Sequence, residues 1–188
     1  MQVARRRLFV AVDLDERSRA ECAAVAERLR AAGWPGRWVA TENYHLTVAF
    51  LGGVDEERHD DVRAALSDAA SRLAPFEVPL DAVGAFPNAR KPRVAWVGPA
   101  EPVPAFTALC EVVRRPLAGL GFTFEPHTDA HVTLARSDGR MLLPSVPSPR
   151  SAHVHVGVLA LYQSFTERAG ARYVVLERFP LSSRTSRD

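Results

Sequence analysis

The chain has 188 residues, of which 47% are hydrophobic and 24% are charged. This length predicts one domain, and this composition excludes a disordered, collagen-like or coiled-coil protein. The net charge of +2, from 24 basic and 22 acidic residues, is too small for a protein that coats nucleic acid through bulk charge, so any contact with RNA must be local.

The first half of the chain predicts strands and helices in alternation. In chain order we expect a strand at 8–12, a helix at 16–32, a strand at 38–39, a strand at 45–51 and a helix at 57–73. Asp13 or Asp15 can cap the first helix, and Gly33 is a natural end for it. Gly52-Gly53 should end the strand at 45–51, and Asp55 is placed to cap the second helix.

The second half predicts one more helix among several strands. We expect strands at 76–83 and 93–97, a helix at 103–118, strands at 122–125 and 132–135, a loop at 139–151, and a hairpin formed by 152–162 and 172–179. Pro116 should kink the third helix or end it early, because proline cannot donate the helical hydrogen bond. The mixture predicts an α+β fold, with residues 1–181 as one domain and 182–188 as a disordered polar tail.

Cysteine usage and the N-terminus indicate a cytoplasmic protein. Cys22 and Cys110 lie far apart in segments expected to be helical, and they form neither a CxxC motif nor a zinc pattern. We therefore expect buried free thiols in a reducing compartment. The apolar stretch at 8–12 is too short for a signal peptide or a membrane span, so no membrane contact is expected.

One short pattern occurs twice. Residues 45–49 read His-Leu-Thr-Val-Ala, and residues 131–135 read His-Val-Thr-Leu-Ala. Side chains two residues apart on a strand point to the same face, so His45 and Thr47 project together, and His131 and Thr133 do the same. If the two strands pair about a pseudo-twofold axis, two imidazoles and two hydroxyls face each other over a cleft.

These four side chains suit the chemistry of a phosphodiester. One histidine can act as general base on a nucleophile and the other as general acid on the leaving oxygen, since imidazole titrates near neutral pH. The threonine hydroxyls can donate hydrogen bonds to the non-bridging oxygens as negative charge develops. Every developing charge has a partner, so this chemistry requires neither a metal ion nor a cofactor.

With these motifs the chain resembles the two-histidine phosphoesterase superfamily, and within it the bacterial and archaeal RNA 2',3'-cyclic phosphodiesterases, historically called 2'-5' RNA ligases. The two His-x-Thr motifs are the specific part of the resemblance. The supporting segments are Arg7-Leu8-Phe9-Val10-Ala11, Glu42-Asn43-Tyr44, Phe50-Leu51-Gly52, Gly84-Ala85-Phe86-Pro87, Pro92-Arg93-Val94-Ala95-Trp96 and Arg136 after the second motif.

The resemblance implies a bilobal α+β fold, with two antiparallel-rich sheets flanking a central cleft, helices on the outside and one motif in each lobe. It implies metal-independent hydrolysis of a 2',3'-cyclic phosphate at an RNA 3' end, leaving a 2'-phosphomonoester, together with a weak 2'-5' RNA ligase activity. His45 and His131 would be the acid–base pair, and Thr47 and Thr133 would bind the phosphate. We expect a monomer whose partners are RNA 3' ends or nucleotides that carry a 2',3'-cyclic phosphate.

The chain departs from this family just before the second histidine. Family members usually have proline there, often with phenylalanine one place earlier, whereas this chain has Ala130 and Asp129. A proline would stiffen the entry to the strand, so its absence could loosen His131. Two alternatives stay open: a binding module that holds a terminal phosphate without turnover, and a phosphodiesterase for small cyclic phosphates such as ADP-ribose cyclic phosphate.

Arg136 and three further histidines allow both a functional and a structural interpretation. Arg136 could contact phosphate from the cleft rim or form a salt bridge, and strict alternation from His131 puts it on the opposite face unless the strand bulges. His153 and His155 share a strand face, and His127 lies four residues before His131. Because no carboxylate or cysteine stands at a ligand-like spacing from them, we do not expect a metal site.

Four aromatic residues could stack on a nucleobase at the cleft, namely Phe50, Phe86, Trp96 and Tyr162. Aromatic residues on strands more often belong to the core, so each of them also has a structural interpretation.

Overall fold

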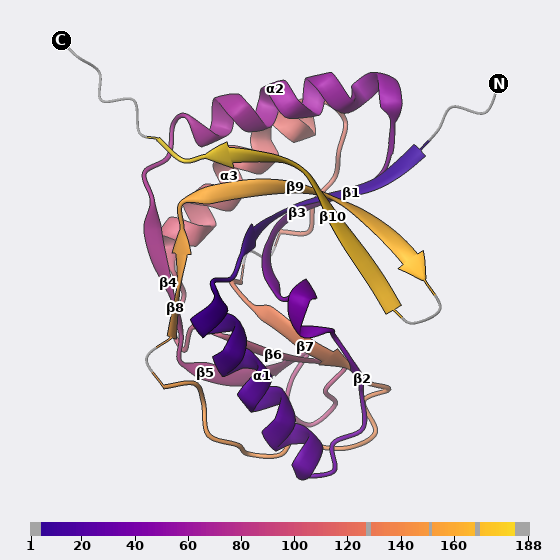
Figure 1. Ribbon diagram of the computed structural model, residues 1–188, viewed down its shortest axis with the longest axis vertical. Coiled ribbons are helices and arrows are strands. Elements are labelled where there is room, and N and C mark those ends of the chain that lie inside the picture. Colours follow the sequence, from indigo (N-terminus) through magenta and orange to yellow (C-terminus); the bar gives the residue numbers. More distant parts are fainter. Residues whose placement is uncertain (1–4, 127–128, 151, 168–169, 183–188) are drawn as a thin grey trace.

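A computed structural model describes residues 5–126, 129–150, 152–167 and 170–182 (Figure 1). Within these ranges the helices are α1 (Glu16–Ala31), α2 (His59–Ala70) and α3 (Pro104–Gly119), with short 3-10 turns η1 (Thr41–Asn43) and η2 (Glu56–Arg58). The strands are β1 (Arg5–Asp13), β2 (Arg37–Trp38), β3 (His45–Asp55), β4 (Phe76–Leu80), β5 (Ala82–Phe86), β6 (Val94–Gly98), β7 (Val132–Arg136), β8 (Ala152–Val156), β9 (Val158–Glu167) and β10 (Gly170–Pro180). The predicted α+β class is therefore confirmed.

Two halves of the main sheet meet at one backbone pair. The strand order is β10-β9-β1-β3-β7-β6-β5, with β2 also paired to β7, and all of these pairings are antiparallel. The register of β3 and β7 contains a single pair, Leu46 with Val132. We call β10-β9-β1-β3 the first lobe and β2, β5, β6 and β7 the second lobe; they occupy the upper and lower halves of Figure 1. Strands β4 and β8 form a separate two-stranded sheet.

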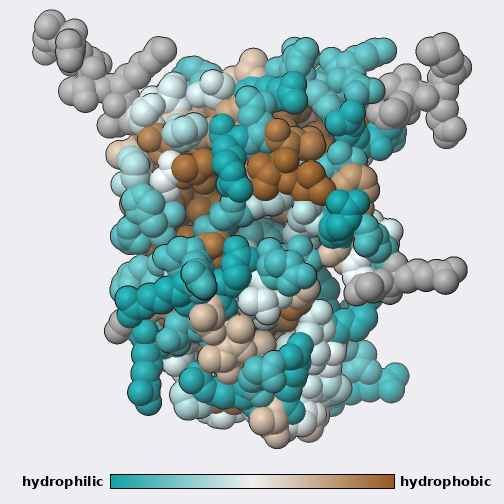
Figure 2. Space-filling model, in the orientation of Figure 1, coloured by the Kyte–Doolittle hydropathy of each residue, from teal (hydrophilic) through white to brown (hydrophobic). Residues whose placement is uncertain are grey.

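Helices cover the outside of both lobes because their buried residues recur every three or four positions. α1 buries Cys22, Val25 and Leu29 and packs against β7 of the second lobe and against β8. α3 packs against α2 and β3, and α2 also contacts β10, so these two helices lie over the first lobe (Figure 1). Figure 2 shows hydrophobic residues at the surface over β9 and β10, strands whose exposed large hydrophobic residues are Val158 and Val174.

The first helix follows the sequence pattern closely. Asp15 is its N-cap, and the Asp15 carboxylate accepts a hydrogen bond of 2.7 Å from the amide of Ser18. The helix ends at Ala31, and Gly33 takes the left-handed backbone conformation with φ of 77° that glycine adopts without strain.

Three predicted strand boundaries were wrong, each because the alternating pattern does not reveal the partner strand. β3 continues through Gly52-Gly53 to Asp55, since Gly52, with φ of 68°, forms part of a bulge against β1 instead of a turn. The segment 76–83 breaks at Asp81 into β4 and β5, which pair with β8 and β6 respectively. The segment 152–162 likewise breaks at Gly157, and the hairpin with β10 starts only at Val158.

The second and third helices also differ from the prediction. η2 precedes α2, and Asp55 makes no side-chain cap bond because its carboxylate binds the Arg5 guanidinium at 3.2 Å. α2 therefore begins at His59, and it ends at Ala70. α3 continues through Pro116 to Gly119, so the predicted early end was wrong. Pro116 lies in the last turn of the helix, so the hydrogen bond that its missing N–H cannot make is lost only near the C-terminal end.

No strand forms at 122–125, although one was predicted there. Phe122 and Phe124 pack against the core, and the Arg114 guanidinium donates to the Glu125 carbonyl at 3.1 Å. Among the described residues no strand pairs with this segment, so its two phenylalanines pack partly buried against the core without a ladder of backbone hydrogen bonds.

Cys22 and Cys110 are free and buried, as expected, and burial raises their thiol pKa to about 12 and about 11. Within the described ranges, none of the helices combines the length and the apolar character needed to cross a bilayer. Of the predicted disordered tail, residues 183–188 lie outside the described residues, while the Ser182 amide donates to the Ala70 carbonyl at 3.2 Å.

Candidate active site

The two His-x-Thr motifs meet where the lobes join. Leu46 pairs with Val132, and each follows the histidine of its motif. Because the pairing is antiparallel, this register places each histidine beside the threonine of the other motif, on one side of the sheet. The four side chains line one pocket of about 100 Å³, which contains His45, Thr47, His131 and Thr133 together with Phe50 and Arg136.

Backbone carbonyls orient both imidazoles in the same way. His45 Nδ1 lies 2.7 Å from the Asn43 carbonyl oxygen, and His131 Nδ1 lies 2.8 Å from the Asp129 carbonyl oxygen. A carbonyl only accepts, so Nδ1 carries the proton in both rings and Nε2 is the nitrogen available for proton transfer. His45 Nε2 lies 3.0 Å from the Thr47 hydroxyl, which donates to it when the imidazole is neutral.

Both imidazoles are less basic than a histidine in water. Burial lowers the pKa of His45, and a charge on His131 lowers it further, against the raising effect of the Asn43 carbonyl. Burial also lowers the pKa of His131, opposed by the Asp129 carbonyl. At neutral pH the neutral form of each ring therefore predominates in the free protein, and one proton enters the pair more readily than two.

Aromatic rings surround the histidines and account for this loss of hydration. The His45 ring centroid lies 5.0 Å from that of Phe9 and 5.5 Å from that of Tyr173. The rings of Phe86 and His131 meet nearly at right angles, with an interplanar angle of 82° and ring centroids 4.9 Å apart. Each imidazole is thus held between an apolar ring and the polar pocket.

A bulge directly after each motif threonine turns a further side chain into the pocket. In β3, Ala11 pairs with Thr47 and Val10 with Ala49, which leaves Val48 as the extra residue. The extra residue restores Phe50, five positions after the histidine, to the pocket side, where it is 60% exposed.

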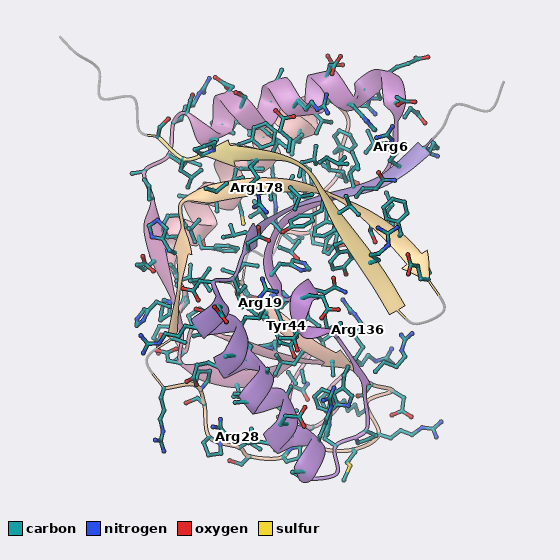
Figure 3. The ribbon with its side chains drawn as sticks, in the orientation of Figure 1. Arg6, Arg19, Arg28, Tyr44, Arg136 and Arg178 are labelled. Carbon is teal, nitrogen blue, oxygen red and sulfur yellow. The ribbon has the colours of Figure 1, made fainter. Side chains whose placement is uncertain are left out.

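The second motif has the equivalent bulge. Trp96 pairs with Thr133 and Ala95 with Ala135, so Leu134 is the extra residue. Arg136 is therefore on the pocket side and not on the opposite face that strict alternation predicts. Among the described residues no carboxylate lies within ion-pair distance of Arg136, and Figure 3 shows Arg136 at the level where the two lobes meet.

Two larger pockets flank this central one. The pocket on the His45 side has a volume of about 570 Å³, and we call it the arginine pocket; its polar lining includes Arg19, Arg172, Arg178, Asp13, Asn43 and Tyr173. The pocket on the His131 side has a volume of about 650 Å³, and we call it the aromatic pocket; its lining includes Phe50, Phe86, Pro87, Thr47 and His131. The central pocket shares lining residues with both, so the three pockets adjoin one another.

The other aromatic candidates have structural positions. The Tyr162 hydroxyl donates to the Asp13 carboxylate, and Tyr162 is buried. The Trp96 indole lies across Gly84, its partner on the neighbouring strand. A Cβ added at Gly84 would approach Trp96 Cζ2 to 2.2 Å, so this position requires glycine. Phe50 and Phe86 are the two of the four that face the aromatic pocket.

The histidines considered as metal ligands lie apart from the cleft or outside the described part. His153 and His155 are exposed on β8, and His155 Nδ1 lies 2.6 Å from the Glu77 carboxylate. His127 falls outside the described residues. In the ranges that the structure describes, no three histidine, cysteine, aspartate or glutamate side chains gather closely enough to hold a metal ion.

Glycine packing fixes the backbone before the second histidine, where the chain departs from the family. Ala130 is buried, and a Cβ added at Gly98 would lie 2.5 Å from the Ala130 carbonyl oxygen and 3.4 Å from the His131 Cα. The backbone of β6 thus holds the entry to β7 directly, without a proline at that position.

Sequence reasoning missed several residues that shape the site. The carbonyls of Asn43 and Asp129 orient the histidines, but every residue has a carbonyl, so no side-chain pattern could reveal them. Tyr173 lines both the central and the arginine pocket and lies 128 positions from His45 in sequence. Only the tertiary arrangement brings the two together.

Comparison with known proteins gives consistent matches. Residues 12–96 match the family model of LigT like phosphoesterases. The RNA 2',3'-cyclic phosphodiesterase of Thermotoga maritima is 30% identical over 175 residues, which cover 90% of this chain and 92% of that protein. The protein of the same name from Archaeoglobus fulgidus is 38% identical over 131 residues, 69% of this chain and 72% of its own. The crystal structure of E. coli LigT complexed with 3'-AMP has a TM-score of 0.78 at 32% identity, covering 95% of this chain and 99% of that one.

Proposed function

Because the chain belongs to the LigT-like phosphoesterase family, we propose that it hydrolyses the 2',3'-cyclic phosphate at an RNA 3' end to a 2'-phosphomonoester. The observation that carries this proposal is the crossed arrangement of the two His-x-Thr motifs about the Leu46–Val132 pair. The names of the relatives and the 3'-AMP bound to E. coli LigT support a nucleotide substrate.

The central pocket has the groups that this hydrolysis requires. The hydroxyls of Thr47 and Thr133 donate to the non-bridging oxygens of the phosphate, and the Arg136 guanidinium neutralises its charge. Each developing charge has a donor among these side chains, so the proposed reaction proceeds without a metal ion.

The aromatic pocket takes the terminal base. Phe50 is largely exposed there, and Phe86 lines the same pocket beside His131, so a base can stack between apolar surfaces. In ribose the base is attached to C1', next to C2', while the 5' arm leaves from C4', next to C3'. A base in the aromatic pocket therefore turns O2' towards His131 and O3' towards His45.

This orientation gives the two histidines different roles. His131 Nε2 removes a proton from a water molecule, whose oxygen attacks phosphorus from the side opposite O3'. The new P–O bond forms as the P–O3' bond breaks, and protonated His45 donates its Nε2 proton to O3'. The phosphate stays on O2'. If an RNA 5' hydroxyl attacks phosphorus in place of water, the P–O3' bond breaks in the same way and the product is a 2'-5' phosphodiester.

The same residues support a proposal for the catalytic domain, the oligomeric state and the cellular compartment of this activity. One histidine comes from each lobe, which supports residues 1–181 acting as one catalytic domain. Both motifs and Arg136 come from one chain, which supports a monomer as the active unit. The two buried free thiols suit the reducing cytoplasm, where we place the activity.

The proposal is tested by incubating the protein, with EDTA present, with an RNA oligomer that ends in a 2',3'-cyclic phosphate and resolving the product. We expect a 2'-phosphate, formed by the wild type and not by a His45→Ala or His131→Ala variant. A 3'-phosphate or a dependence on added metal would overturn the mechanism. Saturable binding without turnover would identify a binding module, and turnover of ADP-ribose cyclic phosphate but not RNA would identify a small-ester phosphodiesterase.

A further inference from the structure

We propose that the arginine pocket binds the phosphodiester and nucleotide that precede the terminal residue, so that the preferred substrate is an oligonucleotide of two or more nucleotides. This inference rests on the proposed function, because it starts from a cyclic phosphate in the central pocket. It adds a second binding site, on the His45 side of the cleft, to the site where chemistry occurs.

The geometry of ribose sends the two arms of the terminal nucleotide in opposite directions. With the cyclic phosphate between His45 and His131, the base leaves through C1' and the 5' arm leaves through C4', on the other side of the ring. The aromatic pocket lies on the His131 side and the arginine pocket on the His45 side. The 5' arm of an RNA end therefore enters the arginine pocket when the base occupies the aromatic one.

The central and arginine pockets adjoin. Asn43, His45 and Tyr173 line both of them, so a nucleotide bound in the central pocket lies next to the arginine pocket. The arginine pocket has a volume of about 570 Å³, within the range of ~300–1,000 Å³ that holds a small ligand. A mononucleoside cyclic phosphate, which has no 5' phosphate, would leave this space unused.

The donors in the arginine pocket suit a phosphodiester. Arg178 Nη1 binds the Asp13 carboxylate at 2.5 Å, and Arg172 Nε binds the Glu167 carboxylate at 2.6 Å. Each guanidinium has five N–H donors, so donors remain on both for a phosphate oxygen. Their carboxylate partners hold the side chains in place while leaving them accessible, with 54% and 53% of the side-chain surface exposed.

Arg19 adds a further positive charge from the opposite wall. Its Nη1 donates to the Thr41 carbonyl at 2.8 Å and its Nη2 to the Leu14 carbonyl at 3.0 Å. Figure 3 shows Arg19 on α1 in the lower half and Arg178 on β10 in the upper half. The carboxylates of Asp13, Glu42 and Glu167 also line the pocket, so the three arginines are balanced by three negative charges. The pocket therefore matches one singly charged diester better than a polyphosphate.

The experiment compares kcat/KM for a nucleoside 2',3'-cyclic phosphate with that for a dinucleotide and a trinucleotide ending in the same group. A charge-assisted contact predicts about a tenfold or greater advantage of the dinucleotide over the mononucleotide in the wild type. The third nucleotide should raise kcat/KM by a smaller factor than the second. One phosphate contact also predicts that raising salt from ~50 to ~200 mM reduces this advantage about 2.6-fold.

Two variants and a matched control place the site. In Arg178→Gln and in Arg172→Gln the dinucleotide advantage should fall at least threefold relative to the wild type. Arg63→Gln is the control. Arg63 forms an ion pair of 2.9 Å with Glu177, the residue before Arg178, but Arg63 is not among the residues that line the arginine pocket. The ratio of kcat/KM for the dinucleotide to kcat/KM for the mononucleotide cancels any change in a variant that affects both substrates equally. Thermal melting checks that each variant is folded.

The outcomes separate this inference from the proposed function. Equal kcat/KM for the mononucleotide and the dinucleotide would overturn the second site and leave the proposed function intact, provided that both yield 2'-phosphates. A dinucleotide advantage that neither arginine variant reduces would overturn the assignment to the arginine pocket. Failure to turn over any of these substrates would overturn the proposed function itself.

Discussion

Leu46 and Val132 form the one backbone pair between β3 and β7, and this pair sets the distance between the two histidines. Each residue follows the histidine of its motif, so the antiparallel register brings the two motifs together in crossed positions. The lobes share no other register pair in these strands. The relative position of the two motifs therefore depends on the one backbone pair at which the two half-sheets meet.

The pH dependence of catalysis follows from the buried imidazoles. Burial lowers both histidine pKa values below their ordinary value of 6.5. The proposed reaction needs one histidine protonated and the other neutral, so kcat/KM should be bell-shaped with its maximum below pH 6.5. Above the upper apparent pKa the singly protonated pair is lost, and the rate should fall about tenfold per pH unit. A maximum above pH 7.5 would contradict this account, since it lies about one pH unit above the ordinary pKa of histidine.

Removing the arginine that the bulge turns inward should slow turnover. Arg136→Ala should lower kcat/KM about 100-fold, because a preorganised donor to the phosphate is lost. Arg136→Lys should recover little of this, since lysine cannot bind two oxygens with a planar fork. Arg37→Ala is the matched control, as Arg37 is the exposed partner of Arg136 in the β2–β7 register. Equal rates for Arg136→Ala and Arg37→Ala would show that Arg136 does not contact the phosphate.

The exposed ring at the cleft should matter for binding and not for folding. Phe50→Ala should raise KM about tenfold through loss of stacking worth ~1–3 kcal/mol per base. Because the Phe50 side chain is 60% exposed, its removal should leave the melting temperature nearly unchanged. Leu142→Ala serves as control, since Leu142 is 63% exposed but is not among the residues that line the aromatic pocket. A large fall in melting temperature without a change in KM would instead assign Phe50 to the core.

The close approach of Gly98 to the second motif predicts a joint effect on stability and activity. Gly98→Ala would put a Cβ 2.5 Å from the Ala130 carbonyl oxygen, so β6 or the entry to β7 must shift. Overpacking of this kind costs about 1–3 kcal/mol of unfolding free energy, and the shift should also reduce kcat by moving His131. Gly119→Ala, where nothing lies within 4 Å, should change neither. The free energy of unfolding from denaturant titration and the initial rate, measured on both variants, test this prediction. Full activity in Gly98→Ala would show that the close approach of Gly98 is not needed to position His131.

The sequence predicts which side chains form the candidate site better than it predicts the side of the sheet on which each of them lies. The two-residue period of a strand is enough to place His45 with Thr47 and His131 with Thr133, because both pairs are local. The side on which Arg136 lies could not be predicted, since the bulge at Leu134 depends on the partner strand β6. The same limit explains Phe50, for which the core was the more frequent expectation for an aromatic residue on a strand.

The fold shows the same division between local and long-range information. The helix at Glu16–Ala31 follows from its cap and its spacing. The breaks at Asp81 and Gly157 arise because neighbouring segments join different sheets, which alternation within one segment cannot reveal. The arginine pocket likewise joins residues of β1, α1 and β10 that are distant in sequence.

The most direct test of the account is a comparison of the two single histidine variants with the double variant. The measurement is the rate of 2'-phosphate formation, in EDTA, from an RNA oligomer that ends in a 2',3'-cyclic phosphate. If His45 and His131 act as one acid–base unit, His45→Ala and His131→Ala should each lower the rate about 100-fold to 10,000-fold, and the double variant should lose no more than the worse single variant. Losses that multiply in the double variant, or full activity after removal of either histidine, would contradict it.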